Sequence, residues 1–572
     1  MSIADRRRGH SGTNEWMRKL APAALAIAML HVTRTQGAVP SESLSRPQVS
    51  ALSTATPPRL VVFLVMDQFR ADYSQTYMHQ WTKGLRRLFT EGAVFDRAAY
   101  PYGGTKTCAG HATISTGALP MVHGMVGNDW FDHSIDRTVS CFEDPSMAGV
   151  PLGGGRSTEH YSWRSLRAPT FVDELGRQAS RRPKVVSIST KPRSAISFAG
   201  AGGVDKVALW LESNGTFATS RAYTTEPWPD VDAYLRARPI SLSFGEMWVP
   251  FLSPSQLLYE DDVPGESRPA PWGRTFPHTI HSTSGVPDDT YRSAWLRSPL
   301  SDRYLTELAI YLLGQRQLGR TEGTDVLTVS LVALDQSGHE FGPRSHEVQD
   351  VLARADQQLG HLLDTLDQTV GRGNYVLAFT SDHGVSQLPE YLATQHLESG
   401  RITSVAAVVN AALTRVLGTP TKAGWVDGAA IAFRSETLEA LRQRPGSLEE
   451  VRRAVEQIPG VAKVYRSEEL SSAEPTSDPW LPAMRLSYYP GRTADLMILP
   501  RRGWIFRSNG GVDHGTPYDY DQRVPLVLFG AGIRAGRYET LASPADIAPT
   551  LATLVHIRMP TAQGRTLTEA LR

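Results

Sequence analysis

The chain has 572 residues, of which 41% are hydrophobic, so it is long enough for one large α/β domain with insertions or for two or three domains. Charged residues make up 20% and the net charge is +1, which argues against global disorder, a nucleic-acid-binding protein and charge-driven membrane binding. Any attraction for an anionic substrate must therefore come from a local site.

The N-terminal segment has the pattern of a secretory signal peptide. Arg18 and Lys19 precede an apolar run over residues 20–30, and a cleavage site follows at Ala38. That run is too short to span a bilayer, and no later stretch reaches about 18 apolar residues. We predict a signal peptide over residues 1–38, with Met17 as an alternative start, and a periplasmic or secreted protein without a membrane span in its mature form.

After a Ser-, Pro- and Thr-rich stretch over residues 39–57, which predicts a flexible leader, strands and helices alternate. Continuous apolar runs predict buried strands over residues 59–67, 184–190, 325–335, 375–382 and 524–530. Periodic patterns predict helices over residues 72–91, 169–177, 302–313, 347–370 and 544–555. This alternation is typical of an α/β fold with a mostly parallel central sheet and helices on both faces.

Two segments interrupt the alternation within the predicted catalytic domain, residues 58–572. Residues 205–300 are rich in Pro, Trp and Tyr and predict an irregular insertion, whose aromatic side chains either pack in a core or shape a pocket. Residues 400–505 carry short helical and strand-like patterns and predict a small α+β insertion.

Aspartates end three of the predicted strands, and histidines accompany them. In open α/β sheets ligands bind at the carboxyl ends of the strands, so these residues are expected to converge. Carboxylate oxygen and imidazole nitrogen suit zinc, and six ligands suit two ions that could clamp an in-line phosphoryl transfer. The candidate ligands are Asp67, Asp335 and His339 in "LDQSGHE", Asp382 and His383 in "TSDHG", and His514 in "DHGTP".

The segment "GGTKTCAGHATISTG" places Thr107 beside Cys108. Small residues after Thr107 fit the N-terminus of a helix, whose unpaired N–H groups and dipole favour a phosphate. In an exported protein, the pair Cys108 and Cys141 predicts one disulfide, with two unrelated buried thiols as the alternative.

Taken in order over residues 59–556, these motifs resemble the alkaline phosphatase superfamily, especially the phosphate-irrepressible alkaline phosphatases related to nucleotide pyrophosphatase/phosphodiesterases. The resemblance implies two Zn²⁺ per chain, with additional structural Ca²⁺ left open. It implies Thr107 as the nucleophile and a metal contact. One ion would be held by Asp335, His339 and His514, and the other by Asp67, Asp382 and His383.

Three further residues bear on the substrate. Lys191 and Arg193 follow the predicted strand 184–190, and in an extended segment their spacing would place both on one side. The resemblance implies that these two cations, together with Asn128 in "VGNDWF", reach the transferred phosphoryl group of a monoesterase, whereas diesterases of the family lack the Lys/Arg pair. It thus implies an alkaline phosphatase that hydrolyses small phosphate monoesters through a phosphothreonine.

Three alternative functions are weighed against features of the sequence. A phosphodiesterase or nucleotide pyrophosphatase on the same scaffold is the main one. A sulfatase is disfavoured because Cys108 lacks the C-x-P-x-R context, and a cytoplasmic phosphomutase is disfavoured by the signal peptide.

Overall fold

The computed structural model describes residues 56–203 and 205–572. The predicted signal peptide and residues 39–55 of the predicted leader lie outside the described residues. Within the described ranges, no helix combines the length and the apolar character needed to cross a membrane.

A ten-stranded sheet lies at the centre of the fold. Its strands, in spatial order, are β20 (Gly536–Ala542), β2 (Ala93–Ala98), β19 (Leu526–Gly530), β12 (Tyr375–Thr380), β1 (Leu60–Met66), β11 (Asp325–Leu331), β6 (Val185–Ser189), β7 (Lys206–Leu211), β8 (Phe217–Ser220) and β5 (Gly149–Pro151). The five strands from β12 to β7 run parallel, which confirms the predicted α/β fold. The predicted strand 524–530 forms β19, but its direction differs from the expected parallel one, because β19 pairs antiparallel with both β12 and β2.

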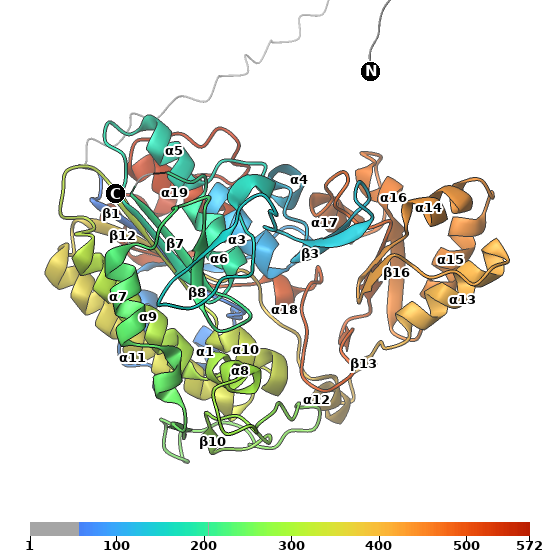
Figure 1. Cartoon of the computed structure of the whole chain (residues 1–572), viewed down its shortest axis with the longest axis horizontal. Coiled ribbons are helices and arrows are strands. Elements are labelled where there is room, and N and C mark those ends of the chain that lie inside the picture. The colour runs from blue at the N-terminus through green and yellow to red at the C-terminus, as the bar shows by residue number, and fades with distance from the viewer. Residues whose placement is uncertain (1–55, 204) are drawn as a thin grey trace, which may run out of the picture. The chain divides into compact units, whose positions relative to one another are not determined.

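Helices cover both faces of this sheet because β1 is apolar on both sides. Alternate residues of β1 point to opposite faces, with Leu60 and Val62 in one core and Val61 and Phe63 in the other. The helices on the first face are α2 (Gly84–Glu91), α7 (Pro229–Ala237), α8 (Asp289–Arg297), α9 (Pro299–Gln315), α10 (Ala333–Phe341) and α11 (His346–Thr369). Those on the second face are α3 (Thr107–Thr116), α5 (Phe171–Gln178), α6 (Pro192–Ala199) and α19 (Ile547–Leu554), as Figure 1 shows.

Three elements differ from the sequence pattern. Strand β11 ends at Leu331, so Asp335 lies in the first turn of α10 rather than at a strand end. The predicted helix 72–91 is interrupted, because Asp356 of α11 accepts from the N–H groups of Thr82 and Lys83 and a new helix begins there. Residues 205–220 are not part of an irregular insertion, since β7 and β8 belong to the central sheet.

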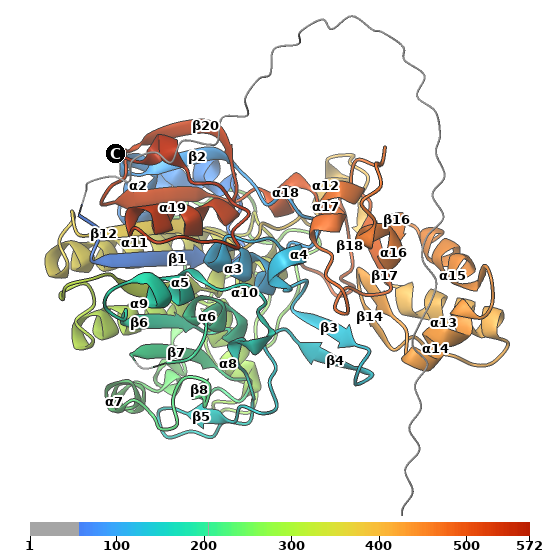
Figure 2. The ribbon, with the colours of Figure 1, turned by 90° about the horizontal axis from the view of Figure 1, so that it is seen from above.

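Residues 400–505 build a separate layer with a core of its own (Figure 2). Its four-stranded sheet has the order β14-β15-β17-β16. The elements of this layer are β13 (Gly400–Arg401), α13 (Val405–Leu417), β14 (Trp425–Asp427), β15 (Ala430–Ala432), α14 (Ser435–Arg442), α15 (Ser447–Glu456), β16 (Val461–Arg466), α16 (Ser467–Ser471), α17 (Leu481–Leu486), β17 (Leu496–Pro500) and β18 (Trp504–Ile505). We call residues 400–505 the inserted layer.

Short elements complete the described chain. They are α1 (Tyr73–Tyr77), η1 (Met78–Gln80), α4 (Pro120–His123), β3 (Asp129–Asp132), β4 (Arg137–Ser140), η2 (Trp163–Ser165), η3 (Ile240–Ser243), β9 (Met247–Trp248), β10 (His278–Thr279), α12 (Pro389–Thr394), α18 (Asp519–Gln522), η4 (Pro544–Asp546) and η5 (Thr568–Ala570).

The irregular segment between η3 and α8 is held by buried polar contacts. Asp350 of α11 accepts a hydrogen bond from Trp248 Nε1 at 2.6 Å, and Trp272 packs against Trp248 in the core of the first face. Glu266 of the same segment is only 5% exposed, and neither of its carboxylate oxygens has a hydrogen-bond partner among the described residues. Burial raises the pKa of Glu266 to about 8.

Glu266→Gln is expected to stabilise the protein at high pH. Because the folded-state pKa lies above the unfolded one, Glu266 favours folding while it is protonated, and this contribution is lost as pH rises through about 8. The variant removes that loss, so its free energy of unfolding should exceed that of the wild type by roughly 2–4 kcal/mol at pH 9 and differ little at pH 5. Calorimetry at both pH values checks this, with exposed Glu260→Gln as the matched control. An equal shift at both pH values would contradict the titration argument.

Candidate metal centre and phosphate site

The predicted aspartate ligands converge at one edge of the sheet. Strands β11, β1 and β12 are adjacent and parallel, so their carboxyl ends meet. Asp67 follows β1, Asp382 lies just past β12, and Asp335 is carried by α10, which follows β11. All three carboxyl groups are buried, with exposures of 0%, 0% and 2% respectively.

Each of the three predicted histidines is oriented by a backbone carbonyl. The Nδ1 atoms of His339, His383 and His514 donate to Val512 O at 2.9 Å, Gly384 O at 2.9 Å and Thr105 O at 2.7 Å. Because a carbonyl only accepts, Nδ1 must carry the proton in each ring. Every Nε2 is therefore left as the acceptor that a metal ion requires.

The donor set contains two overlapping groups that could each hold a metal ion, with His383 common to both. Ligand atoms of Asp67, Asp382 and His383 lie within 4.8 Å of one another, as do those of Asp335, His383 and His514. Asp67 Oδ1 and Asp382 Oδ2 are buried without a hydrogen-bond partner among the described residues, and such carboxylate oxygens suit a cation. His339 lies outside both groups, with its Nε2 3.2 Å from Asp335 Oδ1. Which of the six residues would hold which ion stays a prediction.

Lys191 lies between the two groups of ligands. Its Nζ is 2.7 Å from Asp67 Oδ2 and 2.6 Å from Asp335 Oδ2. Burial, reinforced by Asp335 and Asp382, raises the pKa of Asp67 well above its ordinary value. Burial acts in the same direction on Asp335, but the Lys191 ammonium and His339 hold the pKa of Asp335 well below its ordinary value. The centre thus concentrates negative charge that only cations can balance.

Two of the three histidines, His383 and His514, are electrostatically suited to be neutral ligands. At His339 burial opposes the charged form, but the nearby Asp335 raises its pKa above the ordinary value. Burial, with additional repulsion from His383 and Lys106, lowers the pKa of His514 well below its ordinary value. Burial also lowers the pKa of His383. The rings of His383 and His514 stack with centroids 3.5 Å apart, an arrangement that two imidazolium ions would not tolerate.

Thr107 opens helix α3 next to this centre. Its Oγ1 lies 3.4 Å from His383 Nε2, and the residue is 1% exposed. A Cβ at Gly110, one turn into α3, would lie 2.2 Å from Asp382 O, so only glycine lets the helix approach the loop that carries Asp382 and His383. Gly384 allows a second close approach of backbone, because a Cβ there would lie 2.1 Å from Tyr520 O.

Asn128 lies beside the start of α3, and Arg193 lies on α6, which packs against α3. Asn128 Oδ1 accepts from Cys108 N at 3.0 Å. Arg193 is the second residue of α6, so Lys191 and Arg193 are joined by a helix N-terminus and not by an extended segment as expected. Arg193 Nε is buried without a partner among the described residues, which suits an anionic ligand. Cys108 and Cys141 form the predicted disulfide.

A cavity of about 300 Å³ opens beside these residues. Lys106, Asn128, His339 and His514 line it on the side of the central sheet. The inserted layer closes it with Trp425, Asp427, Met484 and Met497, among others. None of the lining residues comes from residues 205–300. Three of the five tryptophans of that segment, Trp248, Trp272 and Trp295, are buried in the core of the first face.

Three polar residues that are not among the predicted site residues also contact the site. Gln68, in the left-handed region at φ 68°, donates from Nε2 to Asp335 Oδ1 at 2.8 Å. His111 bonds Ser330 Oγ at 2.8 Å through Nε2, and Lys106 donates from Nζ to His514 O at 3.0 Å. Each lies within four residues of a predicted site residue, which is the signal that could have identified it.

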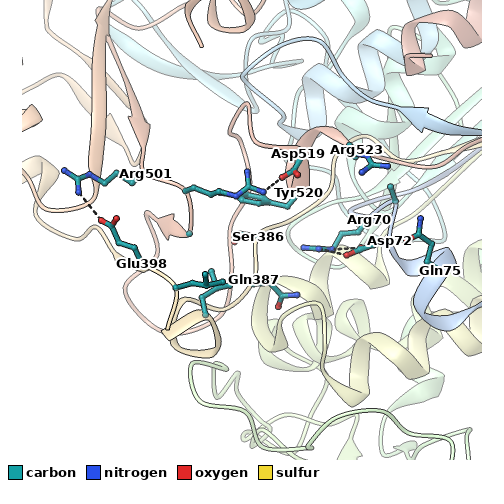
Figure 3. A pocket seen from close by; sticks show the side chains of 15 residues that line it. Arg70, Asp72, Gln75, Ser386, Gln387, Glu398, Arg501, Asp519, Tyr520 and Arg523 are labelled. Atoms are coloured by element: carbon teal, nitrogen blue, oxygen red, sulfur yellow. Dashed lines mark hydrogen bonds and ion pairs between the residues drawn. The ribbon is translucent and has the colours of Figure 1, made fainter. Parts of the chain in front are cut away.

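A second cavity, of about 570 Å³, contains none of the predicted site residues (Figure 3). Its arginines are largely compensated. Arg70 bonds Asp72 at 2.6 Å, Arg501 lies 3.0 Å from Glu398, and Arg502 pairs with Asp519. The positive charge of this cavity is therefore mostly neutralised, in contrast to the anionic centre near Thr107.

Comparisons with known proteins agree with this geometry. The family described as type I phosphodiesterase / nucleotide pyrophosphatase matches residues 61–521. Alkaline phosphatase PhoK of Sphingomonas sp. is 30% identical, with 90% of this chain and 91% of that protein covered. Alkaline phosphatase PafA of Elizabethkingia meningoseptica is 28% identical, with 96% and 100% covered.

Solved structures show the same relationship. The crystal structure of wild-type alkaline phosphatase PafA superposes with a TM-score of 0.82 at 28% identity, covering 91% of this chain and all of that one. Human ectonucleotide pyrophosphatase / phosphodiesterase 5, at 15% identity and a TM-score of 0.52 with 90% and 99% covered, shares the fold. These findings confirm the resemblance inferred from the motifs. The chain belongs to the type I phosphodiesterase / nucleotide pyrophosphatase family, within the alkaline phosphatase superfamily.

Proposed function

We propose that the protein is an exported, metal-dependent alkaline phosphatase that hydrolyses phosphate monoesters through a phosphothreonine at Thr107, with two zinc ions as cofactors. The observation that carries this proposal is that Thr107, Lys191 and five of the predicted Asp and His ligands lie together in one buried centre, with His339 beside Asp335 at its border. The relatives PhoK and PafA, which are named alkaline phosphatases, support the activity. Export rests on the signal-peptide pattern of the sequence.

The residues around Thr107 can bind and orient a phosphoryl group. The Nδ2 group of Asn128 and the Nε of Arg193 are available as donors, Lys191 adds a positive charge, and the N-terminus of α3 adds the helix dipole. Zinc ions at the Asp and His ligands would lower the pKa of the attacking hydroxyl or water and stabilise the leaving oxygen.

Two displacements then complete the reaction. Thr107 Oγ1 attacks phosphorus in line, its proton passes to solvent, and the bond from phosphorus to the ester oxygen breaks as the Oγ–phosphorus bond forms. The leaving alkoxide takes a proton from water and departs. A water molecule next attacks the phosphothreonine and releases phosphate, and Thr107 regains its proton.

Lys191 and Arg193 favour a monoester over a diester. A monoester presents three non-bridging oxygens and one more negative charge than a diester, so additional cations stabilise its transition state more. One solved structure of PafA is a variant with a threonine, an asparagine, a lysine and an arginine replaced together, the same four residue types as those proposed here. The alternative function is a phosphodiesterase or nucleotide pyrophosphatase, which the family description favours.

Removing the metal is expected to abolish the activity reversibly. Treatment with a chelator followed by gel filtration should inactivate the purified protein, and added zinc should restore it, because the centre is built from ligands suited to zinc. Metal analysis should find two zinc ions per chain. Asp335→Asn should lower the zinc content, whereas Asp364→Asn at an exposed position should not.

A substrate panel on the same preparation separates the two functions. The proposed function predicts much faster hydrolysis of p-nitrophenyl phosphate than of bis(p-nitrophenyl) phosphate. The reverse order would establish the diesterase alternative, and activity insensitive to chelators would contradict the metal centre.

A further inference from the structure

We propose that the disulfide between Cys108 and Cys141 positions Asn128 for phosphoryl binding. This inference rests on the proposed function and deepens it, because it assigns to the disulfide a role in binding the substrate rather than in holding the fold. The bond joins the second residue of α3 to the residue that follows β4. Asn128, just before β3, lies between them.

Both cysteines hold Asn128 through their backbone. Cys108 N donates to the side-chain Oδ1 of Asn128 at 3.0 Å. Cys141 N donates to the backbone carbonyl of the same residue at 2.9 Å. The disulfide closes this arrangement, so the backbone and the side chain of Asn128 are tied to two residues that are covalently linked. Because Cys108 directly follows Thr107, the position of Asn128 is set relative to the nucleophile.

The hydrogen bond from Cys108 also determines which way the amide faces. A backbone N–H can only donate, so the atom that meets it must be Oδ1, and Nδ2 must point the other way. Among the described residues no group accepts from Nδ2, and Asn128 lines the cavity beside Lys106 and His514. The N–H groups of the amide can thus bind an anion in the cavity, and this breaks no hydrogen bond of Nδ2 within the described residues.

The remainder of the hairpin β3–β4 does not depend on the disulfide. Asp136, at its turn, accepts from Ser435 N at 3.1 Å and pairs with Arg434 at 2.9 Å, both in the inserted layer. Phe131 packs against Ala432 and Ala494 of the same layer. Loss of the disulfide is therefore expected to loosen the tie between Asn128 and α3 while the hairpin stays in place.

A double-mutant cycle on the full, zinc-loaded protein tests the proposal. The four proteins are the wild type, Asn128→Ala, Cys108→Ala with Cys141→Ala, and the triple variant. The measurements are kcat/KM for p-nitrophenyl phosphate, the affinity for inorganic phosphate by calorimetry, zinc content and Tm. Removing the disulfide should reduce kcat/KM and phosphate affinity roughly 10-fold in the wild type and less than about 2-fold when Asn128 is already alanine. Zinc content should not change.

Equal losses in both backgrounds would overturn the proposal, because they would mean that the disulfide acts through the fold and not through Asn128. If the cysteine variant does not fold, the wild type and Asn128→Ala are compared before and after reduction with a phosphine, with two titrated thiols as proof of reduction. Phosphate affinity should fall in the wild type alone and return on reoxidation; an unchanged wild-type affinity would overturn the proposal. Phosphate binding needs no turnover, so absence of hydrolysis by the wild type would count against the proposed function alone.

Discussion

Thr107→Ala is expected to lower kcat for phosphate monoesters by about 10⁴-fold or more while both metal ions stay bound. Thr107 Oγ1 lies 3.4 Å from His383 Nε2, inside the cluster of predicted metal ligands. Two neighbouring hydroxyls are committed to backbone carbonyls, since Thr105 donates to Thr516 O at 3.1 Å and Ser115 to Ala112 O at 3.2 Å. Removal of the hydroxyl thus removes the proposed nucleophile without a substitute within the helix.

The measurement pairs kinetics with metal analysis. Thr107→Ser is the matched control, because it keeps the hydroxyl at the start of α3 and should retain most of the activity. Acid quenching of the wild type during turnover with labelled substrate should trap a phosphorylated protein, and Thr107→Ala should trap none. Near-normal turnover by Thr107→Ala with zinc still bound would rule out Thr107 as the nucleophile.

Replacing Lys191 and Arg193 together by alanine is expected to lower kcat/KM for p-nitrophenyl phosphate by roughly 10²–10⁴-fold and that for bis(p-nitrophenyl) phosphate by less than about 10-fold. The physical reason is charge. Arg193 has a buried, unpartnered Nε among the described residues, and Lys191 is only 8% exposed beside Asp67 and Asp335. Both cations would act on non-bridging oxygens, of which a monoester carries one more than a diester.

The control for this double variant is the replacement of two exposed cations, Arg156→Ala with Lys422→Ala, which should leave both activities unchanged. Zinc content should also be equal, since no zinc ligand is removed. If kcat/KM falls by the same factor for both substrates, the two cations do not discriminate between monoesters and diesters. That result would support the phosphodiesterase alternative.

Much of the fold was predictable because its strands are buried on both faces. Runs such as residues 59–67 have no polar alternation, and this identifies central strands of an α/β sheet. The direction of β19 was not predictable, because an apolar strand pairs equally well in either direction and its connection decides. The place of residues 205–220 in the central sheet was not predictable either, because their two strands are short and border an irregular segment.

The sequence by itself determined which groups the centre contains, since its carboxylates, imidazoles and the Thr107 hydroxyl stand in recognisable motifs. Only the tertiary structure decided how these groups act on one another. It placed Lys191 between Asp67 and Asp335, joined Asn128 to both cysteines, and closed the cavity with the inserted layer rather than with residues 205–300. The physical reason is that these contacts join segments up to hundreds of residues apart, and their distances follow from the packing of the whole sheet and its helices.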